Sequence, residues 1–191
     1  MRVLLIDNYD SFTFNLLHLI RGVCDNADCI DIIPNNKIDV SGAMNYDSVV
    51  VSPGPGIPQE AGNILSVIKG ISPVKPILGI CLGHQAIAEA FGAAIYCSNS
   101  PLHGVQTGIN IIDKSSVFEG LDDYILAGRY HSWLVNRESV PGSLRVTAVD
   151  NGGNVMAISH IRYRVHGIQF HPESFLTEQG SVIMRNFLKC I

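Results

Sequence analysis

The chain has 191 residues, of which 47% are apolar and 16% are charged, and its net charge is −4. It contains no run of basic residues, which argues against nucleic acid as a partner. No apolar stretch approaches the roughly 18–20 residues of a membrane-spanning helix. We therefore expect a single domain over residues 1–191, located in the cytoplasm and without membrane contact.

The first half of the chain alternates predicted strands and helices. Short apolar runs at residues 3–6, 29–33, 48–51 and 77–80 predict buried strands. Helices are predicted after a cap at Asp10 or Ser11 with a stop at Gly22, over residues 61–69, and from about 84 to 91. This alternation predicts a parallel sheet with right-handed crossovers.

The second half consists mainly of short apolar runs, which predict strands at residues 93–97, 105–112, 124–135, 144–150, 154–160 and 165–170. Asn151-Gly152 predicts a hairpin turn in which both residues have positive φ. Thr177 is a candidate cap for a last helix that reaches about residue 189. The predicted fold class is α/β, with an open, mostly parallel central sheet, helices on both faces and an antiparallel region in the second half.

One of the five cysteines has a distinctive setting. Because the cysteine spacings match no zinc or disulfide framework, we expect buried thiols and no metal site at Cys24, Cys29, Cys81, Cys97 and Cys190. Cys81, however, stands between two glycines at the turn from a predicted strand to a helix, like the nucleophile elbow of serine hydrolases. A helix N-terminus favours a thiolate, and the N–H group of Leu82 lies where an oxyanion would form.

The segment His171-Pro172-Glu173 follows the last predicted strand. In an extended segment, residues i and i+2 share a face, so Glu173 can hydrogen-bond one ring nitrogen of His171. This arrangement favours His171 as a general base and acid and Glu173 as the carboxylate that orients it. Three other histidines are weaker candidates for such a role: His103, His131 and His166.

Five ordered sequence blocks carry a family resemblance, at residues 5–13, 52–56, 79–86, 129–132 and 167–174. With them the sequence resembles the class I, or triad-type, glutamine amidotransferases, and especially the small subunits (component II) of anthranilate synthase and aminodeoxychorismate (para-aminobenzoate) synthase. The resemblance implies a flavodoxin-like fold. It also implies hydrolysis of L-glutamine to glutamate and ammonia by Cys81 as nucleophile, His171 as base and acid, and Glu173.

The resemblance also implies the substrate contacts. It places glutamine against Gly54, Pro55, Gly56, Gln85, Ser132 and Trp133, with an oxyanion hole formed by the N–H of Leu82 and one from the glycine loop. Trp133 stands where the family more often has an aliphatic residue, and its contribution can come from its backbone.

The same resemblance implies a partner and no cofactor. The partner is a larger, chorismate-binding synthase subunit that receives the ammonia. The segment 7–13 and the loop around His103 are candidate contacts with it. Val105 replaces a lysine that is usual in the family, which puts a partner contact in doubt and leaves the chemistry untouched.

Two alternatives from other classes share these residues. A stand-alone γ-glutamyl hydrolase or peptidase on the same fold would use Cys81 and His171, and it would accept bulkier substrates without a synthase. A regulatory module without activity would have no need for an intact set of Cys81, His171 and Glu173. Covalent labelling of Cys81 by a glutamine-analogue electrophile separates the regulatory module from both enzymes.

Overall fold

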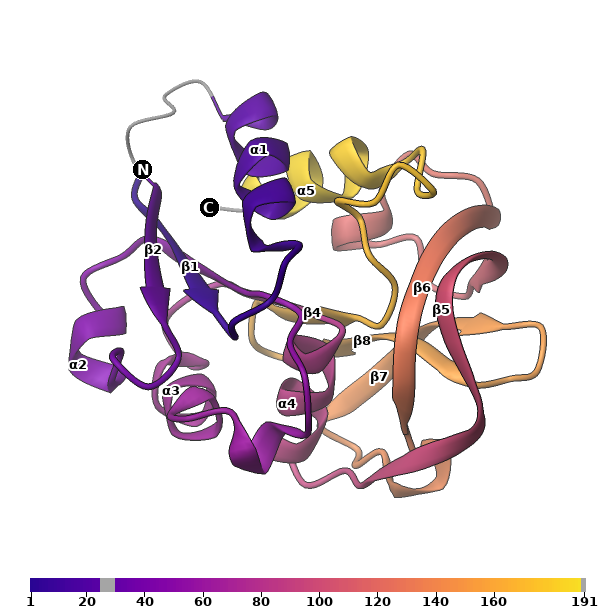
Figure 1. Ribbon diagram of the computed structural model, residues 1–191, viewed down its shortest axis with the longest axis horizontal. Helices are drawn as coiled ribbons and strands as arrows, with labels where there is room; N and C mark the ends of the chain where they lie inside the picture. The colour runs from indigo at the N-terminus through magenta and orange to yellow at the C-terminus, as the bar shows by residue number, and fades with distance from the viewer. Residues whose placement is uncertain (25–29, 190–191) are drawn as a thin grey trace.

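The computed structural model describes residues 1–24 and 30–189, and nine strands of this part of the chain form one sheet (Figure 1). Cys29, predicted to open a strand, and Cys190 lie outside the described residues. The strands are β1 (Val3–Asp7), β2 (Ile30–Pro34), β3 (Ser48–Val51), β4 (Ile77–Ile80), β5 (Ile95–Ile111), β6 (Tyr124–Val135), β7 (Leu144–Asp150), β8 (Val155–His160) and β9 (Val165–Ile168).

The strand order in the sheet is β2-β1-β3-β4-β9-β8-β7-β5-β6. Strands β2, β1, β3, β4 and β9 pair in parallel. The remaining pairings, from β9 through β8, β7 and β5 to β6, are antiparallel. The structure thus confirms an α/β fold with an antiparallel region in the second half of the chain, and β9, from that second half, also joins the parallel part of the sheet beside β4.

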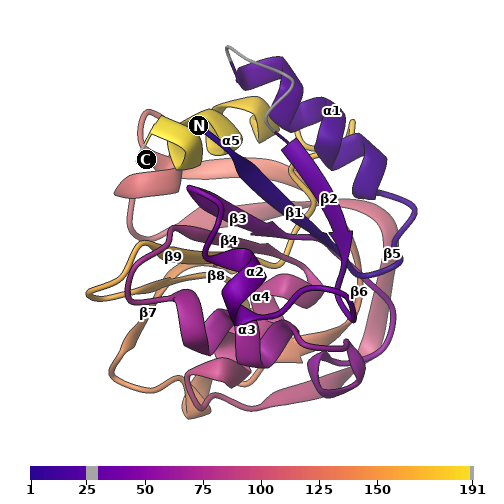
Figure 2. The ribbon, with the colours of Figure 1, turned by 90° about the vertical axis from the view of Figure 1, so that its left-hand side faces the viewer.

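Helices cover both faces of the parallel half (Figure 2). They are α1 (Thr13–Val23), α2 (Val40–Ala43), α3 (Ile64–Ile71), α4 (Leu82–Ala90) and α5 (Gly180–Lys189), with short 3₁₀ turns at Pro58–Glu60, Ser116–Phe118 and Arg137–Ser139. Within the described residues, no helix is long and apolar enough to cross a membrane.

Alternation along the strands divides the core into two layers. Leu5 of β1 packs in the cluster that contains the apolar faces of α1 and α5. Its neighbours Leu4 and Ile6 pack in the other cluster, with α3 and α4. All three side chains are fully buried, because a parallel strand covered on both faces has no side exposed to water.

Several predicted boundaries moved, and the hydrogen bonds explain why. The first helix is N-capped by Phe12 without a side-chain cap, because the Asp10 carboxylate accepts from the Phe12 N–H before the helix begins. This helix also runs through Gly22 to Val23. The last helix begins at Gly180 and not at a cap on Thr177, whose hydroxyl instead donates to the carbonyl of His171.

The predicted strands at residues 93–97 and 105–112 are one strand, β5. Its pairing with β6 shifts register between Cys97 and Leu102 and again between His103 and Val105. On the side away from β6, β5 pairs with β7 only at residues 109–111. At Pro101 the missing backbone N–H therefore breaks no hydrogen bond to β7. The strand therefore absorbs proline and glycine as bulges where the sequence suggested a break.

The predicted hairpin at Asn151-Gly152 joins β7 to β8, but its turn differs from the prediction. Positive φ occurs at Gly153 (80°) and not at Asn151 or Gly152. The N–H of Gly153 donates to the carbonyl of Asp150, which makes the loop one residue longer than the predicted two-residue turn. The exposed thiol of Cys97, on β5, also departs from the expectation of buried cysteines.

Candidate active site

The parallel strands β1, β3, β4 and β9 are neighbours, so their carboxyl ends meet at one edge of the sheet. Cys81 follows β4 directly, and its N–H donates to the carbonyl of Ile168 at the end of β9, at 2.9 Å. The chain continues from Ile168 into Gln169 and His171. The nucleophile candidate and the histidine candidate are therefore brought together by strands that are adjacent in the sheet and far apart in sequence.

The turn at Cys81 is strained and tightly packed. Cys81 has φ 53° and ψ −102°, a conformation that costs a non-glycine residue roughly 1–3 kcal/mol. A Cβ on Gly79 would lie 2.3 Å from the carbonyl oxygen of Gly83, and one on Gly83 would lie 2.6 Å from that of Val51. Both glycines are thus required by close backbone contacts, and they hold the sharp elbow that the sequence predicted.

His171 and Glu173 form a buried pair. The distance from His171 Nδ1 to Glu173 Oε1 is 2.7 Å, and the two side chains are 2% and 0% exposed. The backbone of His171 is held by its N–H to the carbonyl of Gly128 at 3.0 Å and by the Thr177 hydroxyl at 2.7 Å. The i, i+2 relation predicted from the sequence is therefore present, and β6 anchors it.

Electrostatic interactions favour a protonated His171. Burial lowers the pKa of His171, but its interactions with Cys81 and Glu173 outweigh burial and raise that pKa above its ordinary value. Nε2 of His171 is buried and makes no hydrogen bond of ordinary geometry with the described residues. The ring nevertheless lies close enough to the Cys81 sulfur to interact with it. The arrangement suits an imidazolium beside the sulfur of Cys81.

A pocket of about 220 Å³ opens beside the elbow. Its lining residues are Gly54, Pro55, Gly56, Gln85, Tyr130, His131, Ser132 and Trp133. Pockets for drug-sized ligands hold roughly 300–1,000 Å³, so this one suits a smaller molecule such as a single amino acid.

Six of the seven residues predicted to contact glutamine line this pocket, and Leu82 does not. The side chain of Leu82 instead packs on the loop, where a Cβ on Gly54 would lie 2.8 Å from Leu82 Cδ2. Leu82 is the first residue of α4, so its N–H has no acceptor within the helix.

A glutamine pair that the sequence analysis missed connects Cys81 to the pocket. The Gln169 amide donates to Cys81 Sγ at 3.6 Å, and its oxygen accepts from Gln85 Nε2 at 3.2 Å. Gln85 Nε2 also donates to the carbonyl of Trp133 at 3.0 Å. Gln169 is fully buried and lies within the last of the five sequence blocks, two residues before His171, which is the only sequence signal that marked it.

The glycine loop after β3 rests on buried polar groups. The Asn8 N–H donates to Ser52 Oγ at 2.9 Å, and the Asn8 side chain donates to the Ser52 carbonyl at 2.7 Å. Asn35 in turn donates to Asn8 Oδ1 at 2.9 Å. Because a Cβ on Gly54 would lie 2.5 Å from Asn8 Cβ, the loop and Asn8 are in direct contact. The segment at residues 7–13 therefore supports the pocket wall.

The structure places the three weaker histidine candidates in different surroundings. Only His131 of the three lines the pocket. His166 is held between Ser116 and Ser159, at 3.0 and 2.8 Å, beside a different cavity. His103 stacks edge-on against Tyr130, with ring centroids 5.7 Å apart.

Comparison with known proteins identifies the family of this chain. The family model of the class-I glutamine amidotransferases matches residues 4–190. The chain therefore belongs to the class I glutamine amidotransferase family.

Three similar proteins have names more specific than the family name. "Bifunctional protein TrpGD" of Thermotoga maritima is 42% identical over 98% of this chain, which spans only 32% of that longer protein. Anthranilate synthase component 2 of Mycobacterium tuberculosis is 41% identical over 100% of this chain and 82% of its own length. Aminodeoxychorismate/anthranilate synthase component 2 of Bacillus subtilis is 39% identical over 98% of this chain and 95% of its own.

A solved structure shows the same fold. The crystal structure of a glutamine amidotransferase from Thermotoga maritima superposes with a TM-score of 0.83 over 100% of this chain and 97% of the other. At 16% sequence identity, this likeness supports the fold and no finer similarity.

Proposed function

We propose that this chain hydrolyses L-glutamine and supplies the ammonia to a larger, chorismate-binding synthase subunit that makes anthranilate or aminodeoxychorismate. The observation that carries the proposal is the meeting of Cys81, His171 and Glu173 at one sheet edge beside a small pocket. The names of the relatives support the identity of the partner.

The mechanism is acyl transfer. The Cys81 thiolate attacks the side-chain amide carbon of glutamine, forming a C–S bond while the carbonyl π electrons move onto the oxygen. His171 gives a proton to the nitrogen, the C–N bond breaks, and ammonia leaves. His171 then takes a proton from water, whose oxygen attacks the thioester, and glutamate and the thiol are released. Glu173 keeps the imidazole oriented in both half-reactions.

The oxyanion of each tetrahedral intermediate needs donors that are already in place. We assign these to the N–H of Leu82 and an N–H of the loop Gly54-Pro55-Gly56. Glycine leaves the backbone bare, so its N–H can approach the oxygen, and losing one such donor costs about 2.7–4 kcal/mol of transition-state stabilisation.

Aromatic contacts connect the predicted partner surface to the proposed catalytic histidine. Phe12, from the segment predicted to contact the partner, packs on Tyr130 and on His171, with ring centroids 4.9 and 5.3 Å away. Tyr130 also contacts His103, in the second predicted contact. We therefore expect low glutaminase activity in the isolated chain and a higher rate in the complex. Equal rates with and without the synthase would argue for the stand-alone γ-glutamyl hydrolase.

Cys81 and Cys97 are free thiols, and a reducing compartment keeps thiols in this state, which supports the proposal of a cytoplasmic location. The test of the chemistry compares Cys81→Ala with Cys97→Ser, which changes an exposed thiol. We expect Cys81→Ala to abolish glutamine-dependent synthesis and covalent labelling by a glutamine-analogue electrophile, while ammonia-dependent synthesis by the complex persists. Cys97→Ser should keep all three. Glutaminase activity retained by Cys81→Ala would refute the assignment.

A further inference from the structure

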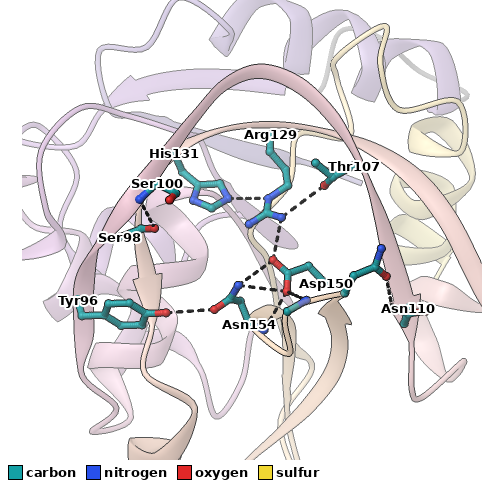
Figure 3. Close-up of polar contacts among 11 residues, drawn as sticks. Tyr96, Ser98, Ser100, Thr107, Asn110, Arg129, His131, Asp150 and Asn154 are labelled. Atoms are coloured by element: carbon teal, nitrogen blue, oxygen red, sulfur yellow. Dashed lines mark hydrogen bonds and ion pairs between the residues drawn. The ribbon is translucent and has the colours of Figure 1, made fainter.

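A buried cation contacts His131, one of the residues that line the proposed glutamine pocket (Figure 3). Arg129 of β6 is only 5% exposed. Its Nη1 forms an ion pair with Asp150 Oδ2 at 2.9 Å, and its Nε donates to His131 Nε2 at 3.0 Å. Burying an ion pair costs desolvation energy that apolar packing would avoid, so this pair invites a functional explanation.

The carboxylate of Asp150 is held in place by the turn between β7 and β8. Its Oδ1 accepts from the N–H groups of Gly152 and Asn154, each at 2.9 Å, and the Asn154 side chain also donates to it. Burial alone would raise the pKa of Asp150, but hydrogen bonds from Asn154 and Arg129 outweigh burial and lower it. The aspartate is therefore a fixed anion that holds the guanidinium against His131.

The guanidinium determines which ring nitrogen of His131 carries the proton. An arginine Nε–H always donates, because its side chain does not lose its proton in proteins. His131 Nε2 must then accept, and the neutral ring carries its hydrogen on Nδ1. Burial lowers the pKa of His131, and the positive charges of Arg129 and His171 lower it further, to about 3, so the ring is neutral.

The Nδ1–H group is left at the pocket wall. His131 is 7% exposed and lines the pocket beside Ser132 and Trp133. The backbone of Trp133 lies near the ring, yet Nδ1 has no hydrogen bond of ordinary geometry within the described part of the chain. A buried donor without a partner is costly, and an oxygen of a ligand in this pocket would satisfy it.

We propose that Arg129, anchored by Asp150, is a positioning residue that locks His131 in its Nδ1–H tautomer, so that His131 offers a hydrogen-bond donor to an oxygen of bound glutamine. The second half of this inference rests on the proposed function. The turn at residues 150–154, which no sequence motif connected with the site, thereby becomes part of the support of the substrate pocket.

The first test observes the wild-type chain and uses one variant only to assign the signal. In the intact 15N-labelled chain, long-range 1H–15N NMR correlations distinguish an imidazole protonated on Nδ1 from one protonated on Nε2, and His131→Gln assigns the signal. We expect a neutral ring with the proton on Nδ1 from pH 5 to pH 8. A ring protonated on Nε2, or one that becomes cationic in this range, would overturn the proposal.

The second test is kinetic and uses the complex with the synthase. The double variant Arg129→Met/Asp150→Asn removes both charges together, which avoids leaving one buried and unpaired. We expect the KM for glutamine to rise about tenfold, as for one lost hydrogen bond, with kcat within about threefold. The KM should also depend more strongly on acidic pH, because loss of the Arg129 charge raises the pKa of His131 from its value of about 3, while burial still holds it below the ordinary value.

The matched control is Arg145→Met/Asp113→Asn, which removes an ion pair of the same 2.9 Å length outside the pocket. It should leave the KM and its pH dependence unchanged. An unchanged KM in the folded Arg129→Met/Asp150→Asn variant would refute the substrate contact. No glutamine hydrolysis by the wild-type complex would instead refute the proposed function, and the NMR result would remain independent of it.

Discussion

Replacing Glu173 by glutamine isolates the charge of the proposed orienting residue. Glutamine has nearly the same shape, and its side-chain oxygen can still accept from His171 Nδ1 across the present 2.7 Å. What disappears is the negative charge beside the imidazole. Because both side chains are almost completely buried, water screens this loss very little.

The size of the effect follows from the two kinds of hydrogen bond. A bond to a charged group contributes about 1.5–3 kcal/mol and a neutral one about 0.5–1.5 kcal/mol. The difference between the middles of these ranges is about 1.25 kcal/mol, which is close to one pKa unit. The glutamate stabilises the charged ring, so its removal should lower the pKa of His171 by about this amount.

Two assays measure the consequence of Glu173→Gln. An NMR titration should give the lower pKa of His171. Glutaminase kinetics in the complex should show kcat reduced about tenfold at neutral pH, by the same free energy. The KM for glutamine should stay unchanged, because Glu173 does not line the pocket. Glu138→Gln, at an exposed glutamate, is the control.

An unaltered His171 pKa in a folded Glu173→Gln variant would refute the argument that the carboxylate raises it. A raised KM with normal kcat would also contradict it, since that pattern assigns Glu173 to substrate binding.

Gly83→Ala should place a methyl group 2.6 Å from the Val51 carbonyl oxygen, and we expect it to abolish glutaminase activity and to destabilise the fold by about 1–3 kcal/mol in urea unfolding. Gly22→Ala is the control, because a Cβ at this position in α1 meets nothing within 4 Å, and it should stabilise the fold by up to about 1 kcal/mol. Equal effects of the two changes on stability would refute the packing argument. Asn8→Ala should leave buried partners of the Asn8 amide unsatisfied, which should lower the free energy of unfolding by about 1–3 kcal/mol in the same assay and raise the KM for glutamine. An unchanged KM would contradict the role of Asn8 in supporting the loop. Hydrogen bonds from Ser115 and Arg145 lower the pKa of Asp113 to about 2, so Asp113→Asn should be less stable than wild type above pH 4, and this gap should close as the pH falls towards 2.

The catalytic candidates were readable in the sequence because each depends on local chemistry. Gly79 and Gly83 flank Cys81 in a pattern typical of a sharp strand–helix turn, and the contact that requires Gly79 is with Gly83, four residues away, although the one that requires Gly83 is with Val51 of β3. His171 and Glu173 face each other because an extended segment puts i and i+2 on one side. The alternation of apolar strands and helices similarly reflects burial of single elements.

Other parts of the site could not be read because their partners are remote in sequence. Gln169 matters through Cys81, which is 88 residues away, and its own neighbours give no sign of that contact. His131 looked like one weak candidate among three until β6 placed it in the pocket. Thr177 had the character of a helix cap, but the approach of His171 offered its hydroxyl a buried carbonyl instead.

By itself, the sequence determined the α/β class, the sharp turn at Cys81 and the pairing of His171 with Glu173, whereas most of the pocket wall was implied by the family resemblance. The first three features follow from backbone sterics and short-range periodicity, which residues a few positions apart already specify. Only the tertiary structure decided that β4 and β9 lie side by side, that Gln169 joins Cys81 to Gln85, and that a turn on β7 holds Arg129 against His131. Such contacts depend on which strands pair in the sheet, and that choice is made by the burial of the whole core.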